Sequence, residues 1–313
     1  MFDLLINAEI IVDDVDIAER VFVDALGFPE PRHWWRGAVT SAGFTYLFAR
    51  VHPSLKVSPT RVEAMAVAPI DAGVEPFLPK LLAAQGRRPW KTHGNELAAS
   101  NIDAVAARLE RNGCRFYTMP REEGYPFMRL WLGWTADDVG AYRPDVDGGL
   151  MFEICETESL LQGPALWDSQ PDPVVPPGSM IRVLRRSWIV EDLQDSLALI
   201  DRNLGWRPRL SPETDLATGC RRAVFDFVHP RSAELELLEP VAAGEVRESL
   251  DAWGPGSWRI RIGVNDLVAK AADLRHRGTR FESYESAADG TLLRVDTGAM
   301  GAPGLFEFAR LPA

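Results

Sequence analysis

The chain repeats one helix-length pattern four times, and this repeat constrains its fold more than any other sequence feature. Each copy consists of an apolar strand-like run, an Asp or Asn, about three helical turns, and a Gly. Asp and Asn side chains cap the first turn of a helix, and Gly ends a helix in a left-handed conformation. The four pairs are Asp14–Gly27, Asn101–Gly113, Asp192–Gly205 and Asp266–Gly278. Their separations of 13, 12, 13 and 12 residues alternate, which indicates a pair of modules that is duplicated once.

The repeat continues on both sides of each helix. Before the caps, apolar side chains alternate with polar ones, as in the run from Trp258 to Val264, and this alternation is typical of strands. After the helices, Leu-Gly-Phe at 26–28 matches Leu-Gly-Trp at 204–206, and Val-His-Pro at 51–53 matches Val-His-Pro at 228–230. Because further strand-like runs follow each helix, we predict an α+β chain of four βαβββ modules.

The chain is long enough for two domains with separate cores, because it has 313 residues and 46% apolar content. Prolines are frequent between Leu161 and Met180, and they predict an extended linker there. The predicted boundaries are 1–160 for the first domain, with modules 1–80 and 88–157, 161–179 for the Pro-rich linker, and 180–313 for the second domain, with modules 180–240 and 255–311.

Composition narrows the classes of partner. The formal net charge of -11 and the absence of a basic block argue against nucleic acid. No apolar run reaches the roughly 18 residues that a membrane span needs, so we expect no membrane partner. Three cysteines without metal-type spacing, and no secretory leader pattern, favour a cytoplasmic protein. A small-molecule ligand is the expected partner, and a homo-oligomer stays open.

These features together resemble a known group of proteins. Val-x-Asp at the strand ends (12–14, 190–192 and 264–266), Leu-Gly-aromatic after the helix, and Gly-x-x-x-Glu at 149–153 resemble the vicinal oxygen chelate superfamily. This group includes glyoxalases, extradiol dioxygenases and bleomycin-resistance proteins. The resemblance covers nearly the whole chain outside the linker. It implies two paired-module domains whose curved mixed sheets surround a cavity.

The resemblance also implies a metal site, typically two His and one Glu that bind Fe, Mn, Zn or Ni. The first-strand ligands are expected seven residues before each cap, at Asn7, Gly94, Arg185 and Arg259, and none of these is His. The last-strand positions align with Glu153, Glu236 and Glu307, whereas the first module leaves Glu63 and Met65 as alternatives.

The second domain is predicted to lack such a site. A guanidinium stays charged and cannot bind a cation. We therefore predict that Arg185 and Arg259 pair with Glu236 and Glu307 in the cavity.

The first domain has residues that suit either a metal site or metal-free acid–base chemistry. His93 lies one residue from the expected position, and with Glu153 it supplies half of a metal site. Glu9, Glu96 and Glu153 are the predicted general-base residues, because crowding and burial raise carboxyl pKa values. Tyr125 or Tyr142 is predicted to donate a proton or orient the substrate. A divalent Fe, Mn, Zn or Ni ion and a metal-free site both stay open.

Aromatic residues predict where a ligand binds. Trp131, Trp134 and Tyr142 lie in a stretch of the second module that the fourth module lacks. With Trp34 and Trp35 they are predicted to line a pocket for a flat or apolar ligand. The alternative is that they fill the core or close the end of the sheet.

Three functions fit these observations. The first is an enzyme of the dioxygenase, lyase or isomerase type that acts on a small aromatic or oxygenated substrate through an atypical or absent metal site. The second is a metal-free binding or resistance protein without turnover. The third is a non-catalytic assembly or regulatory module. The retained carboxylates favour the enzyme.

Overall fold

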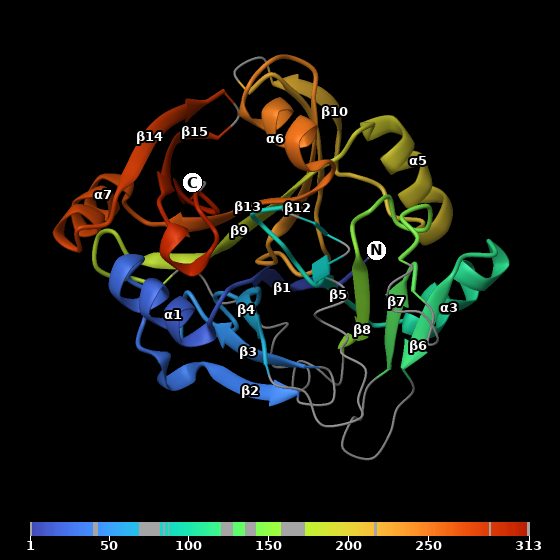
Figure 1. Cartoon of the computed structure of the whole chain (residues 1–313), viewed down its shortest axis with the longest axis horizontal. Coiled ribbons are helices and arrows are strands. Elements are labelled where there is room, and N and C mark those ends of the chain that lie inside the picture. Colours follow the sequence, from blue (N-terminus) through green and yellow to red (C-terminus); the bar gives the residue numbers. More distant parts are fainter. Residues whose placement is uncertain are drawn as a thin grey trace.

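Strands from the two halves of the chain build two separate eight-stranded sheets (Figure 1). This computed structural model describes residues 2–39, 43–68, 82–83, 85–86, 88–119, 128–134, 142–157, 173–215, 218–287 and 289–311. The first sheet has the order β2 (Trp35–Val39), β3 (Phe44–Ala49), β4 (Arg61–Val67), β1 (Leu4–Ile11), β5 (Asn95–Ala99), β8 (Phe152–Glu156), β7 (Arg129–Leu132) and β6 (Phe116–Met119).

The second sheet repeats this order. Its strands are β10 (Leu210–Asp215), β11 (Cys220–Phe225), β12 (Glu234–Pro240), β9 (Met180–Ile189), β13 (Gly256–Val264), β16 (Phe306–Arg310), β15 (Gly290–Val295) and β14 (Phe281–Ser286). In both sheets the first strand of the half is central. It runs parallel to the last strand of its own module and antiparallel to the first strand of the next module. The predicted α+β fold of paired βαβββ modules is thereby confirmed. Most of the predicted Pro-rich linker lies outside the described residues.

The helices begin where the sequence predicts. They are α1 (Val15–Arg20), which continues as a π-helical turn (Val21–Ala25), α3 (Ile102–Arg111), α5 (Leu193–Leu204), α6 (Glu245–Trp253) and α7 (Leu267–His276), with short 3-10 turns at Pro31–His33 and Gly298–Met300. The predicted caps Asp14, Asn101, Asp192 and Asp266 each accept a backbone N–H of the first turn. Helix α6 lies outside the repeat and was not predicted.

The helix ends also hold the two halves together. Arg277, the C-cap of α7, donates to the carbonyl oxygens of Val23 and Asp24, at 2.9 and 3.1 Å. In the same way, Arg108 of α3 donates to the carbonyl oxygens at the end of α5, at 2.8 Å for Asp201. Accordingly, Figure 1 shows α1 with α7 on one side of the molecule and α3 with α5 on the other.

The Leu-Gly-aromatic repeat therefore has a second role. Gly27 and Gly205 have φ angles of 75° and 67°, which favour glycine. A Cβ at Gly27 would also lie 3.0 Å from the guanidinium of Arg277, and one at Gly205 would lie 2.7 Å from that of Arg108. These glycines thus allow both the helix ends and the contacts between the halves.

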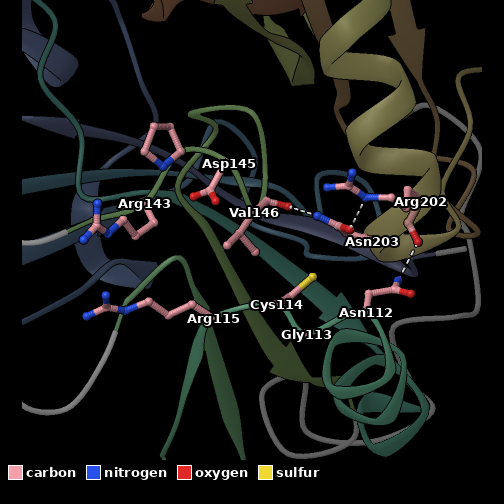
Figure 2. A pocket seen from close by; sticks show the side chains of 10 residues that line it. Asn112, Gly113, Cys114, Arg115, Arg143, Asp145, Val146, Arg202 and Asn203 are labelled. Carbon is pink, nitrogen blue, oxygen red and sulfur yellow. Dashed lines mark hydrogen bonds between the residues drawn. The ribbon is translucent and has the colours of Figure 1, made fainter.

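A cleft of about 470 Å³ lies between α3, the segment 143–146 and the end of α5 (Figure 2). Its walls are joined by Asn112 Nδ2, which donates to the Arg202 carbonyl at 2.7 Å, and by Asn203 Nδ2, which donates to the Val146 carbonyl at 2.7 Å. Tyr142 precedes the segment 143–146, and none of the predicted site residues lines this cleft. No helix in the described part of the chain is long and apolar enough to cross a bilayer.

Candidate active site

One face of the first sheet gathers buried polar groups at its centre. Ala8 and Ile10 of β1 pack in the core with residues of α1, so the strand alternation turns Asn7 and Glu9 to the opposite face. This first inner face also receives Glu63 from β4, Glu96 from β5 and Glu153 from β8, and all five side chains belong to residues no more than 7% exposed. Cross-strand pairing sets Asn7 opposite Glu96, and Glu96 opposite Glu153.

This pairing corrects the position counted from the helix cap. The count placed the second-module equivalent of Asn7 at Gly94, whereas Asn7 pairs with Glu96. In the second half, Arg185 pairs with Arg261 and not with Arg259. The offset is two residues, which keeps the side chain on the same face because strand side chains alternate with period two. The strand therefore meets its helix two residues sooner in the second module of each half.

Asn7 links two of the carboxyl groups. Its Nδ2 donates to Glu63 Oε2 at 2.9 Å and also to Glu96 Oε2. Its Oδ1 accepts from Arg61 Nε at 3.0 Å. The sequence left Glu63 and Met65 as alternatives, and the structure places Glu63 at this centre. Arg61 was missed because only the pairing of β1 with β4 brings it beside Asn7.

Glu9 and His93 form a fixed pair. Glu9 Oε2 lies 2.7 Å from His93 Nδ1, while its Oε1 accepts the His93 backbone N–H. The far ring atom, Nε2, lies 3.9 Å from Glu153 Oε2, which is too long for a hydrogen bond. The ring also packs edge-to-face against Trp131 at 5.0 Å. Glu9 thus orients the ring and leaves Nε2 directed at Glu153.

The surroundings of this site raise the pKa of one histidine and of two carboxyl groups. Burial disfavours the imidazolium, but the charge and hydrogen bond of Glu9, together with Glu153, outweigh it and raise the pKa of His93 to about 10. Burial, and then the charge of Glu153, raise the pKa of Glu96. Burial, followed by Glu9 and Glu96, raises the pKa of Glu63 well above its ordinary value. Environments that separate the pKa values of neighbouring groups are typical of acid–base sites.

Arg129 was another residue that the sequence did not indicate. It lies on β7 and its Nη1 is 2.5 Å from Glu153 Oε1. The second module is longer here than the fourth, so the repeat does not fix the register of β7, and no pattern marked this residue.

Aromatic residues form one end of the first inner face. Ile11, Met65 and Trp134 are buried there. Trp131 and Tyr142 pack against them, and the rings of Trp134 and Tyr142 are 5.0 Å apart. Burial, and then the neighbouring Asp147, raise the pKa of Tyr142 well above its ordinary value.

The other predicted ligand contacts lie elsewhere. The structure places Trp34 in the core that the two halves share, next to Phe22 and Phe28. Trp35 is 62% exposed on the edge strand β2, against Phe48. Tyr125 lies outside the described residues.

The second inner face carries the predicted ion pairs. Arg185 Nη1 lies 3.0 Å from Glu236 Oε1, and Arg259 Nη1 lies 2.6 Å from Glu307 Oε1, which confirms that prediction. Arg261 adds a contact of 3.1 Å to Glu307. Burial opposes the charged carboxylate, but Arg259 and Arg261 outweigh it and lower the pKa of Glu307 to about 2. Glu236, Arg259, Arg261 and Glu307 border a cavity of about 310 Å³.

Comparison with solved structures identifies the fold. A triple mutant of 4-hydroxymandelate synthase from Streptomyces coelicolor matches with a TM-score of 0.62 and 14% identity, over 99% of this chain and 93% of that chain. The Mn(II)-bound glyoxalase from Novosphingobium aromaticivorans matches with a TM-score of 0.58 and 14% identity, over 99% of this chain and 82% of that chain. This chain has the vicinal oxygen chelate fold. No protein-family model and no curated protein matches its sequence.

The vicinal oxygen chelate fold implies a divalent metal, so the donor set of the first inner face decides whether one fits. Ligand atoms of Glu96, Glu153 and Cys155 all lie within 4.8 Å of one another. However, Arg129 is bonded to Glu153, and a guanidinium repels a dication. The amide nitrogen of Asn7, and not its oxygen, faces the carboxyl groups.

His93 does not complete the set either. Its Nδ1 is engaged by Glu9, and His93 is not among the residues whose ligand atoms converge with those of Glu96 and Glu153. As arranged, these residues do not fit a resident divalent metal.

Proposed function

We propose that the first inner face is the active site of an isomerase or lyase that moves protons on a small oxygenated or aromatic substrate without a resident metal. The observation that carries this proposal is the opposition of two kinds of group in one buried site. His93, with a raised pKa and fixed by Glu9, shares this face with Glu63 and Glu96, two buried carboxyl groups whose pKa values are also raised. A base with a raised pKa and a positioned acid are the two parts that proton transfer requires.

Glu96 is the proposed base. Its raised pKa makes its carboxylate a stronger proton acceptor than an exposed glutamate. It removes a proton from a carbon next to a carbonyl group, and the electron pair of the C–H bond moves onto the carbonyl oxygen as an enolate. Burial strengthens this step, because the carboxylate is not stabilised by water.

His93 is the proposed electrophilic partner. Nε2 carries a proton and points toward Glu153, so a carbonyl oxygen near this atom accepts a hydrogen bond from a full positive charge. Glu9 holds the ring through Nδ1 and thus acts as a positioning residue. Return of the proton to the other face or to a neighbouring carbon gives an isomer. Loss of a leaving group from the next carbon gives the product of a lyase.

The aromatic end supports a substrate with a flat or apolar part. Trp131 packs against the ring of His93, so a group that lies on Trp131 is adjacent to the acid. This contact also supports the second candidate, a protein that binds a small aromatic molecule without turnover.

Proton exchange tests the proposal without knowledge of the substrate. We would incubate the protein in D₂O with a panel of aromatic and aliphatic α-hydroxy and α-keto acids and a hemithioacetal of glutathione, and follow deuterium incorporation by NMR. We expect exchange for at least one compound, with a loss of about a hundredfold or more in Glu96→Gln and in His93→Gln. Glu19→Gln, which alters a surface ion pair with Arg36, is the control that keeps full activity.

Two outcomes would contradict the proposal. Binding of a panel compound without exchange would favour the binding protein. Near one equivalent of a divalent metal in untagged protein, measured by plasma mass spectrometry and lost in Glu153→Ala, would show that the site is a metal site.

A further inference from the structure

The two sheets differ sharply at one end of their inner faces. In the first sheet Leu4, Ile6, Ala98 and Cys155 fill this end and are at most 1% exposed. The pairing registers match Leu4 with Arg182, and Cys155 with Ala309. In this apolar plug of the first half, Leu4 thus corresponds to a charged residue of the second half, and Cys155 corresponds to a smaller one.

A cavity of about 520 Å³ lies where the second half lacks the plug. This volume is within the range of roughly 300–1,000 Å³ that is typical of small-molecule sites. Leu184, Phe227 and Pro230 supply its apolar wall. The first half fixes part of this wall, because the backbone N–H of His229 donates to the Asp3 carbonyl at 2.9 Å, and Ser232 Oγ accepts from Leu5 N at 3.0 Å.

The lining of this cavity is rich in arginine, and we call it the arginine pocket. Its charged residues are Arg182, Arg185, Arg209, Arg261 and Arg310, against Asp226, Glu234 and Asp289. The lining therefore carries two more positive than negative charges, in a chain whose formal net charge is -11. A local surplus of the opposite sign inside an acidic protein marks a place where an anion is stabilised.

The ion pairs of the arginine pocket set the positions of its guanidinium groups. Arg185 lies 2.9 Å from Glu234 and 3.0 Å from Asp289. Arg209 lies 2.5 Å from Glu234, and Arg261 lies 2.6 Å from Asp289. Two of the three carboxylates are thus shared between arginines, so they repel an incoming anion less than isolated carboxylates do.

We propose that the arginine pocket binds a small anion through a carboxylate or phosphate group. Guanidinium groups recognise both oxyanions through paired, charge-assisted hydrogen bonds. The wall of Leu184, Phe227 and Pro230 contacts the apolar part of an organic anion. This site is separate from the first inner face and does not depend on the function proposed for it.

Isothermal titration calorimetry in Tris chloride at constant ionic strength tests this proposal, with inorganic phosphate and benzoate as the probes. We expect saturable binding of at least one probe. Tighter binding of benzoate would identify a carboxylate with an apolar body as the ligand, and tighter binding of phosphate a phosphate group. The double variant Arg182→Gln/Arg310→Gln changes residues at the rim of the sheet and is expected to weaken binding about tenfold or more.

The control has the same net charge change at two residues that do not line the pocket. Arg207→Gln/Arg280→Gln removes two arginines whose side chains are 78% and 87% exposed, and it should leave affinity unchanged. The proposal is overturned if neither probe saturates, or if the control weakens binding as much as the rim variant. It is also overturned if Glu96→Gln abolishes binding, because the anion then lies in the first half.

Discussion

The two inner faces share strand order and register, but their central paired residues differ in charge. Asn7 and Glu96 face one another in the first half, where Arg185 and Arg261 face one another in the second. The next strand carries a glutamate in both halves, opposite Glu96 in one and opposite Arg261 in the other. The same backbone therefore presents a carboxylate to a carboxyl group in one half and to a guanidinium in the other.

This difference shows that one cross-strand partner decides what a buried carboxylate can do. Beside Arg261 and Arg259, Glu307 stays ionised with a pKa of about 2 and serves stability. Beside Glu153, Glu96 has a raised pKa and is held in an unfavourable environment. Groups kept in such environments are typical of sites that trade stability for reactivity.

The largest effect is expected from a comparison of two single variants, in each of which a buried glutamate of one inner face is changed to glutamine. Glu307→Gln leaves the buried guanidinium groups of Arg259 and Arg261 without their carboxylate. We expect a loss of about 3–5 kcal/mol in the free energy of unfolding, measured with urea. Glu96→Gln removes one of several crowded carboxyl groups, so stability near neutral pH should stay equal or rise. Equal losses in both variants would show that the two faces do not differ in this way.

The repeat in the sequence predicted the architecture because its signals are local. Capping side chains and helix-ending glycines act within one turn, so Asp14 and Gly205 could be assigned from their own segments. The face of each strand residue also follows from alternation, and Glu96 lies buried on the inner face opposite Glu153. Its partner across the sheet was not predictable, because the strand-to-helix connections differ by two residues between modules.

The remaining site residues depend on contacts that no local pattern encodes. Arg61 and Arg129 reach the site only through the pairing of β4 with β1 and of β7 with β8. Trp34 was expected near a ligand, but the docking of the two halves places it next to Phe22 in their shared core. Side-chain partners across distant strands are set by tertiary packing, which propensity and spacing do not report.

The second effect is on the pH dependence of the free energy of unfolding, which should differ in direction between a residue of the first half and a residue of the second. The pKa of His93 rises from 6.5 to about 10 on folding, so its stabilisation is complete below about pH 6.5 and is lost as pH rises toward 10. The pKa of Glu307 falls from 4.5 to about 2, so its stabilisation is complete above about pH 4.5 and is lost as pH falls toward 2. His93 therefore contributes to stability up to alkaline pH, and Glu307 contributes to stability down to acid pH.

Unfolding free energies across this range test that assignment. The difference between wild type and His93→Gln should be on the order of 3 kcal/mol near pH 6 and should vanish near pH 10. The difference between wild type and Glu307→Gln should stay constant over that range and shrink only below about pH 4.5. A His93→Gln difference that does not depend on pH would mean that the ring is neutral in the folded protein.

The smallest effect on stability is expected at the two arginine–helix contacts, a feature that the two halves have in common. Arg277 and Arg108 each donate to the carbonyl oxygens at a helix end of the opposite half. Each also contributes positive charge to the negative end of a helix dipole, so Arg277→Ala and Arg108→Ala should each cost about 1 kcal/mol in the free energy of unfolding.

The two contacts lie on opposite sides of the molecule, and their costs should therefore add in the double variant (Figure 1). Val174→Ala is a surface control that should change stability little, because Val174 is fully exposed and lies outside both contacts. A cost confined to one of the two arginines would show that the halves are docked mainly at one end. The resemblance between the helix ends would then reflect the sequence repeat and not an equal role in docking.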